Sequence, residues 1–349
     1  MNIRRTIWVF VCVFSAVGIT SAVKADFTFG EPANLRTVIP VFDPVHESID
    51  CFSGDGLEIY LASDRPGGSG GYDVCLAKRA TADGDWSVPE PLGPSVNTSK
   101  HENGAWISAD GLTLYFSSSG LAGYGNFDIY MTTRTAHGES WGEPVNLGPI
   151  INSSSGDAEP CLSQNGMELY FASWRPNGYG SGDIYVARRT TMNEPWGAPV
   201  NLGPMVNSPK TEQSICLSPD GLLLLLVSDR PGGYGGADMW MTRRASLSDP
   251  WQQPVNLGPQ VNSPMNEAMP YILGDGSTLY LATYSVADSG DTWENWQVPI
   301  IPIVDFNGDG KVDGKDLLQM IVELGGSDAL CDIGPYAWGD GVVDFEDLR

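Results

Sequence analysis

The chain has 349 residues, 43 of them acidic and 19 basic, and its formal net charge is −24. This excess of negative charge argues against binding to nucleic acid or to anionic membrane surfaces, and it suits a protein that binds cations. The length allows one large domain and one small domain.

Residues 1–25 have the pattern of a secretory signal peptide. Arg4 and Arg5 precede an apolar run (7–19) that is too short to span a bilayer comfortably. Small residues then surround a cleavage point after Ala25. We therefore expect a secreted, extracellular protein cleaved near Ala25, with an uncleaved anchor as the alternative.

A 55-residue repeat follows the signal peptide. Tryptophans recur at this interval at Trp86, Trp141, Trp196 and Trp251. Turn glycines keep the same interval at Gly56, Gly111, Gly166, Gly221 and Gly276. Five units in constant register indicate five copies of one supersecondary block.

One copy of the repeat reads as four strands. In the fourth copy these are EQSICLS (212–218), LLLLLVS (222–228), ADMWMTRR (237–244) and the proline-bearing WQQPVNLG (251–258). PDG and glycine-rich turns separate the strands, as in hairpins. Four short strands repeated at such an interval predict the blade of a β-propeller.

The two ends of the repeat region indicate how the ring closes. The fifth copy has no outer-strand sequence after NWQVPI (295–300), whereas FGEPANL (29–35) matches WGEPVNL (141–147). We therefore predict an all-β, five-bladed propeller over residues 26–300, whose last blade is completed by the N-terminal strand.

The repeat units resemble the WD-like propeller repeats of the TolB type. The resemblance rests on SPDG (218–221), LYFSS (114–118), LYFAS (169–173) and DIYVARR (183–189). It implies the propeller fold and, in function, the binding of proteins or small ligands, because one fold hosts many chemistries.

An acidic residue stands at the start of each predicted first strand. The five are Glu47, Glu102, Asp157, Glu212 and Glu267. First strands line the channel of a propeller, so five carboxylates could surround the axis and bind a cation or a polar ligand. The alternative is that they serve every blade by accepting backbone hydrogen bonds.

Two further sets recur around the glycine-rich turns. Asp73, Asp128, Asp183 and Asp238 follow the turns, and Arg65, Arg175 and Arg230 precede three of them. We expect a structural role for these residues, through a salt bridge or through carboxylate-to-backbone bonds.

Aromatic residues also recur within the turns. Tyr124, Tyr179 and Tyr234 could be ligand platforms, or they could pack over the turn glycines.

The cysteines point to packing more than to disulfides. Five cysteines lie beyond residue 25, and an odd number cannot pair completely. Cys51, Cys161 and Cys216 share one blade position, which Trp106 and Tyr271 fill in the other two copies. We expect all three to be buried thiols.

Catalysis would require departures from the repeat. Glycosidases use two carboxylates in different environments, and the acids that break the repeat are Asp50 and Glu159, with His46 and His101 nearby. No serine-hydrolase or zinc-protease motif is present. We assign no catalytic residue, and a polysaccharide-degrading glycoside hydrolase is kept as the alternative.

After a short linker (301–304), DFNGDGKVDGKDL (305–317) has the spacing of a calcium-binding loop. Gly310 occupies the sharp turn at position 6 of the twelve-residue loop. The expected ligands are Asp305, Asn307, Asp309, the carbonyl of Lys311, Asp313 and Asp316. We expect Ca²⁺ here, followed by a helix from residue 317.

A second loop of the same kind ends the chain. Its expected ligands are Asp340, the carbonyl of Val342, Asp344 and Asp347, while Tyr336 and Trp338 stand at positions 1 and 3. Ligation there would be weaker or altered. The chain stops before a second helix, so the module would be truncated.

Two such loops resemble a type I dockerin over residues 305–349. The resemblance implies a small α-helical, calcium-folded module that docks onto a cohesin-like partner. The prediction is thus a secreted, non-catalytic binding protein for a protein or glycan ligand, tethered through calcium. A hydrolase and a structural cell-surface protein are the alternatives.

Overall fold

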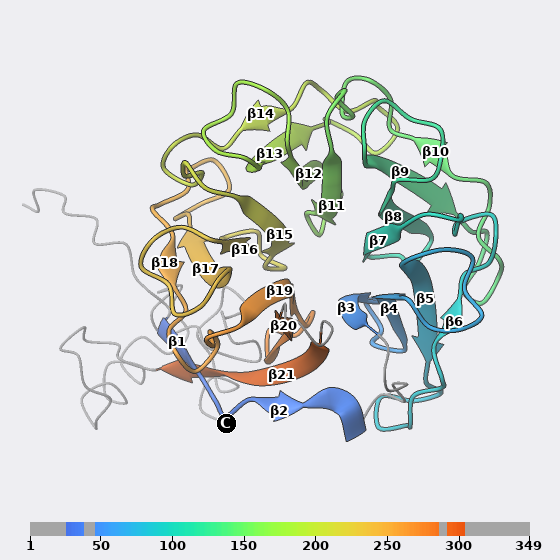
Figure 1. Ribbon diagram of the computed structural model, residues 1–349, viewed down its shortest axis with the longest axis horizontal. Coiled ribbons are helices and arrows are strands. Elements are labelled where there is room, and N and C mark those ends of the chain that lie inside the picture. The colour runs from blue at the N-terminus through green and yellow to red at the C-terminus, as the bar shows by residue number, and fades with distance from the viewer. Residues whose placement is uncertain (1–25, 38–45, 286–291, 304–349) are drawn as a thin grey trace, which may run out of the picture.

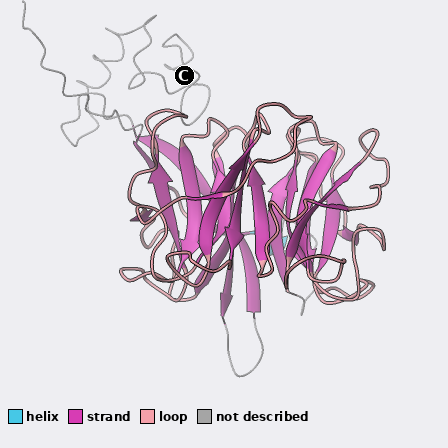
Figure 2. Cartoon of the chain, turned by 90° about the horizontal axis from the view of Figure 1, so that it is seen from above, coloured by secondary structure: helices cyan, strands magenta, loops and turns pink. Residues whose placement is uncertain are grey.

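The protein forms a five-bladed β-propeller, as the repeat predicts. The computed structural model describes residues 26–37, 46–285 and 292–303. Five antiparallel sheets stand around a central axis, with their first strands innermost (Figure 1). Seen from the side, the strands run between two faces that carry the loops (Figure 2).

The blades follow one another in chain order. Blade 1 comprises β3 (Glu47–Phe52), β4 (Glu58–Ser63), β5 (Asp73–Lys78) and β6 (Glu90–Pro91). Blade 2 comprises β7 (Glu102–Ile107), β8 (Thr113–Ser118), β9 (Asp128–Thr133) and β10 (Val145–Asn146). Blade 3 comprises β11 (Asp157–Leu162), β12 (Glu168–Ser173), β13 (Asp183–Arg188) and β14 (Val200–Asn201). Blade 4 comprises β15 (Glu212–Leu217), β16 (Leu223–Ser228), β17 (Asp238–Arg243) and β18 (Val255–Asn256).

Blade 5 joins the two ends of the propeller. Its inner strands are β19 (Asn266–Ile272), β20 (Thr278–Ser285) and the long β21 (Thr292–Ile303). On the outside, β1 (Asp26–Phe29) and β2 (Ala33–Asn34) both pair with β21, and a 3₁₀ turn (Leu35–Thr37) follows. The predicted closure by the N-terminal strand is therefore confirmed. Residues 301–303, which the sequence assigns to a linker, pair with β1 instead.

The fourth strands are shorter than the sequence predicts. Of WQQPVNLG (251–258), only Val255 and Asn256 pair with β17. Pro254 has no N–H to donate to the ladder, and a strand with a single partner tolerates the interruption.

The repeated tryptophans hold the outer strands to the blades. Trp86, Trp141, Trp196 and Trp251 are each 8% exposed. An arginine lies over each ring, with its guanidinium carbon 4.2–4.7 Å from the ring centroid. Such cation–π contacts strengthen when they are desolvated. The 55-residue interval therefore marks a structural requirement of the blades.

The recurrent aspartates stabilise the glycine-rich turns through backbone bonds, one of the two predicted ways. In blade 2 the Oδ2 atom of Asp128 accepts the N–H of Tyr124 at 2.6 Å. The predicted salt bridge to the preceding arginine is not formed, because that arginine turns towards the first strand. Arg175 contacts Asp157 at 2.7 Å, and Arg230 contacts Glu212 at 3.0 Å.

Several predictions lie outside the described residues. These are the signal peptide, both calcium loops and the helical module. Within the described ranges, no helix is both long and apolar enough to cross a membrane.

Candidate functional site

The five acids that begin the first strands are buried in the blades. Glu102, Asp157, Glu212 and Glu267 have no exposed surface, and Glu47 is 4% exposed. In blade 4, Glu212 accepts hydroxyl bonds from Ser228 at 2.8 Å and from Ser208 at 2.5 Å. It also accepts the N–H of Ser208 at 2.8 Å. These bonds join the incoming loop to the second strand of the same blade.

Not every one of these acids has the same partners. Arginines pair with Glu47, Asp157 and Glu212, whereas blade 2 has Gly120 at the arginine position. Glu267 is bonded by Ser263, and burial raises its pKa to about 7. In the structure, the five carboxylates are therefore engaged by groups of their own blades.

Asp50 and Glu159, which break the repeat, meet deeper in the channel. Each first strand has a β-bulge here, and Gly104, Glu159, Ser214 and Met269 have positive φ angles of 47–60°. Oδ2 of Asp50 accepts the N–H of Ala105 at 2.9 Å. Oε2 of Glu159 accepts the N–H of Ser214 at 2.5 Å. Each acid thus binds a backbone donor of the next blade.

The two carboxylates share a small cavity. Its volume is about 20 Å³, and both acids line it together with Trp106. Burial raises the pKa of Asp50 to about 8, with the N–H of Ala105 acting against this and the charge of Glu159 adding to it. Burial also raises the pKa of Glu159. A cavity of this size holds about one water molecule.

The next layer of first-strand residues fills the channel. Cys51, Cys161 and Cys216 are buried free thiols, as predicted. The Sγ atoms of Cys161 and Cys216 accept N–H groups of the following blade at 3.2 and 3.3 Å. The same layer contains Trp106 and Tyr271, whose ring centroids lie 5.7 Å apart.

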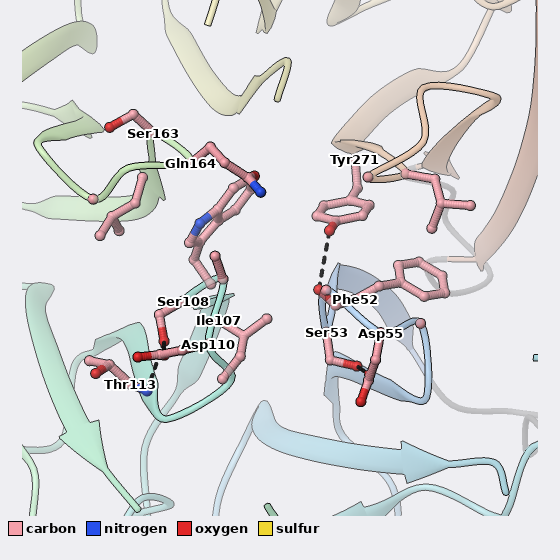
Figure 3. A pocket seen from close by; sticks show the side chains of 18 of the residues that line it. Phe52, Ser53, Asp55, Ile107, Ser108, Asp110, Thr113, Ser163, Gln164 and Tyr271 are labelled. Atoms are coloured by element: carbon pink, nitrogen blue, oxygen red, sulfur yellow. Dashed lines mark hydrogen bonds between the residues drawn. The ribbon is translucent and has the colours of Figure 1, made fainter. Parts of the chain in front are cut away.

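Beyond this layer the channel widens into a cavity of about 650 Å³. It opens among the turns that join first and second strands, where Figure 3 shows Ser53, Ser108 and Ser163 around it. Its aromatic surface comes from Phe52, Trp106, Tyr115 and Tyr271. Tyr271 donates its hydroxyl to the backbone carbonyl of Phe52 at 3.1 Å, which orients the Tyr271 ring.

Small residues keep one side of this cavity open. The second residue of the turn is Gly54, Ala109 or Gly274 in three blades, and it is Gln164 in blade 3. Blade 4 has Pro219 at this position, and its turn does not line the cavity. The opening is therefore asymmetric even though the blades repeat.

Three aspartates surround the opening. Asp55, Asp110 and Asp275 lie in the turns that line the cavity. The Ser108 hydroxyl and the Leu112 N–H lower the pKa of Asp110. For Asp55, partial burial acts in the opposite direction, but bonds from Ser53 and Leu57 still lower its pKa. These carboxylates can accept hydrogen bonds from a ligand.

Arg79 supplies hydrogen-bond donors to the same cavity. Its Nε donates to the carbonyl of Gly56 at 2.8 Å. The equivalent Arg134 and Arg244 pair with Glu58 and Glu168, but Arg79 has no carboxylate in ion-pair distance among the described residues. Its Nη atoms are thus available to a polar ligand.

The sequence does not predict this cavity. The position of Trp106 and Tyr271 reads as a packing position, although aromatic residues in place of cysteine in two of the five copies are a visible signal. In the part of the chain that the structure describes, no group of three or more His, Cys, Asp or Glu side chains is placed to hold a metal ion.

Comparison with known proteins bears on the fold alone. No family model matches the chain, and no curated protein matches it. An endo-arabinase from Bacteroides thetaiotaomicron is 16% identical with a TM-score of 0.50, covering 82% of this chain and 100% of that one. A putative TolB from Agrobacterium tumefaciens is 17% identical with a TM-score of 0.46, covering 80% and 100%.

An α-L-arabinofuranosidase from Podospora anserina is a further structural neighbour. It is 12% identical with a TM-score of 0.48, and the match covers 80% of this chain and 98% of that one. A glycosidase and a TolB protein thus stand side by side among the neighbours, and at these identities the likeness extends to the propeller fold only.

Proposed function

We propose that this chain is an exported, non-catalytic binding protein whose propeller takes a segment of a glycan or a protein into the 650 Å³ cavity. The observation that carries the proposal is the composition of that cavity. Trp106 and Tyr271 offer aromatic surface, while Asp110 and Arg79 offer an acceptor and a donor. Cavities of this size, mostly apolar and with a few polar groups, are typical of ligand sites.

The glycan form of the proposal follows from the mixture of groups. Sugar rings present C–H faces that pack on aromatic rings, and they present hydroxyls that both donate and accept. The three aspartates accept, and Arg79, Gln164 and Asn165 can donate. A strongly charged ligand would lie against side chains of both charges, the aspartates and Arg79. A neutral glycan therefore matches the lining best.

The positions of Asp50 and Glu159 favour binding over hydrolysis. Neither acid lines the large cavity, and the small cavity between them has room for about one water molecule. Their oxygens accept backbone N–H groups across blade boundaries. Both acids therefore have a structural role that does not require a substrate.

A glycan array followed by calorimetry would test the proposal. We expect saturable binding of an oligosaccharide, and loss of that binding in Trp106→Cys, which introduces the residue that three other blades carry at this position. Tyr280→Phe, outside the cavity lining, is the matched control. Binding that survives Trp106→Cys unchanged would contradict the cavity as the site.

The hydrolase alternative has its own readout. Reducing-sugar release from the bound glycan, abolished by Asp50→Asn or Glu159→Gln while folding is retained, would overturn the non-catalytic proposal. If no glycan binds, the glycan form of the proposal fails.

We further propose that the C-terminal residues hold calcium and tether the propeller to a cohesin-like partner. The donor set of the first loop supports this, because carboxylates, one amide oxygen and one carbonyl suit Ca²⁺. Calcium titration of the full chain should show binding that Asp305→Asn combined with Asp309→Asn removes. Unchanged binding in that variant would refute the assignment.

A further inference from the structure

Three tyrosines project from the propeller face opposite the cavity. Tyr124, Tyr179 and Tyr234 occupy the same position in blades 2, 3 and 4, and they are 51%, 50% and 53% exposed. Each lies in the turn between the second and third strands. The cavity opens among the turns between first and second strands, so antiparallel pairing puts the tyrosines at the other end of the blades.

The turns that carry these tyrosines are fixed by hydrogen bonds. In blade 3, Oδ2 of Asp183 accepts the N–H of Tyr179 at 2.6 Å, and Oδ1 accepts that of Gly180 at 3.0 Å. The side chain of Asn201 donates to the same carboxylate at 2.8 Å. Blades 2 and 4 have the same bonds. The ring is thus displayed on a backbone that loses little freedom on binding.

Blade 1 shows that the turn does not need the tyrosine. Ser69 stands at the equivalent position, and its N–H donates to Oδ2 of Asp73 at 2.8 Å. The turn therefore keeps its backbone bond without any ring. The recurrence of tyrosine in three blades needs a reason other than the shape of the turn.

The residues beside each tyrosine, in contrast, are required by the fold. Glycine flanks the position on both sides in these turns, as in Gly178 and Gly180. A Cβ atom at Gly178 would overlap the carboxylate of Asp183, and one at Gly180 would overlap the carbonyl of Lys210. Neither sequence neighbour therefore carries a side chain that could cover the ring.

We propose that the three tyrosines form a second binding surface, which contacts separate residues along one polysaccharide chain. Equivalent contacts on adjacent blades match a ligand that repeats its own chemistry. Flat rings without bulky sequence neighbours suit the C–H faces of sugars, and tyrosine offers a rigid amphipathic surface at small entropic cost.

Avidity follows from three linked contacts. Each contact alone is weak, but the second and third become intramolecular once the polymer is held. A short oligosaccharide that reaches one tyrosine should therefore bind far more weakly than the polymer. The surface does not involve the cavity, so the two proposals can fail independently.

The matched substitution comes from blade 1 of the same protein. Tyr124→Ser, Tyr179→Ser and Tyr234→Ser each introduce the side chain of Ser69, so the variants should fold, which thermal unfolding would check. The measurement is co-sedimentation of the full chain with cellulose, chitin and insoluble xylan. We expect the triple variant to lose about 100-fold in apparent affinity for the bound polymer.

The reverse substitution provides a gain of function. Ser69→Tyr should tighten polymer binding by adding a fourth ring. Asp220→Asn, in a turn that carries none of the tyrosines and does not line the cavity, should leave polymer binding unchanged. Wild-type protein that sediments with none of the three polymers would overturn the proposal. So would a triple variant that binds as tightly as wild type, or a Ser69→Tyr variant without any gain.

Discussion

The first strands of the propeller contain two kinds of layer, and their comparison separates structure from candidate function. At the start of these strands, the acids of all five blades are engaged by groups of their own blade, such as Ser208 and Ser228 around Glu212. Further along, Asp50, Glu159, Trp106 and Tyr271 each differ from the residues at equivalent positions. The cavities lie against this second layer.

The difference teaches where to look for function in a repeat protein. A residue present in every blade satisfies a need that every blade has. A ligand on the axis meets all blades at once, so its contacts can differ from blade to blade. The residues that break the repeat are accordingly better candidates than the residues that keep it.

The largest expected effect tests the layer of acids that every blade repeats at the start of its first strand. Glu212→Gln should destabilise the protein by about 3 kcal/mol, because Arg230, whose side chain is only 11% exposed, would lose its charged partner. Glu102→Gln is the matched control, since blade 2 has no such arginine, and it should cost about 1 kcal/mol. Unfolding in urea measures both changes. Equal losses would mean that the arginine contributes nothing.

The sequence was sufficient to predict the five blades, the closing N-terminal strand and the buried thiols. It was not sufficient to predict which residues meet across blades. Arg134 and Glu58 are 76 positions apart and join two blades through bonds of 2.7 and 3.0 Å. Such contacts depend on the rotation between blades, which no single repeat encodes.

The candidate site was predicted only in part. Asp50 and Glu159 are recognisable in the sequence as exceptions to the repeat, but the left-handed backbone of Glu159 and the backbone partners of both acids are not. Glu159 has a φ of 58°, which is uncommon outside glycine, so the sequence gives little sign of it. The cavity depends on Gly54, Ala109 and Gly274, whose importance is the space they leave empty.

A second prediction concerns the pH dependence of stability and Asp50, one of the two acids that break the repeat. Asp50 has a raised pKa of about 8 in the folded protein, against 3.8 ordinarily. Between these values the folded state binds more protons than the unfolded state, so stability falls as the pH rises. The stabilisation is fully present below the unfolded pKa and is lost as the pH rises through about 8.

Asp50→Asn should therefore flatten the stability profile between pH 5 and 9. The wild-type slope from this group is at most about 1.4 kcal/mol per pH unit. Unfolding free energies at several pH values provide the measurement. Glu267→Gln is the comparison from the acids that every blade repeats. The stabilisation that protonated Glu267 provides should be lost as the pH rises through about 7. An unchanged slope in Asp50→Asn would show that this carboxyl is ionised in the folded protein.

A smaller effect on stability is expected for Tyr271, in the layer of first-strand residues that also contains Trp106. Tyr271→Phe removes the hydroxyl bond to the carbonyl of Phe52 and should cost about 1 kcal/mol. Tyr280→Phe is the control, because Tyr280 also packs on Phe52, with ring centroids 4.5 Å apart. Urea unfolding of both variants would compare them. A loss in Tyr271→Phe no larger than that in the control would show that the hydroxyl bond to Phe52 contributes nothing to stability.

The smallest effect on stability should accompany a clear effect on binding. Asp110 and Asp220 have the same role in their turns, each accepting a serine hydroxyl and a leucine N–H through Oδ1. Asparagine keeps an acceptor, so Asp110→Asn and Asp220→Asn should each change stability by less than about 0.5 kcal/mol. Asp110 lines the cavity and Asp220 does not. Only Asp110→Asn should therefore weaken binding of the array-selected oligosaccharide, by roughly tenfold, and equal affinities in calorimetry would refute a ligand contact at this turn.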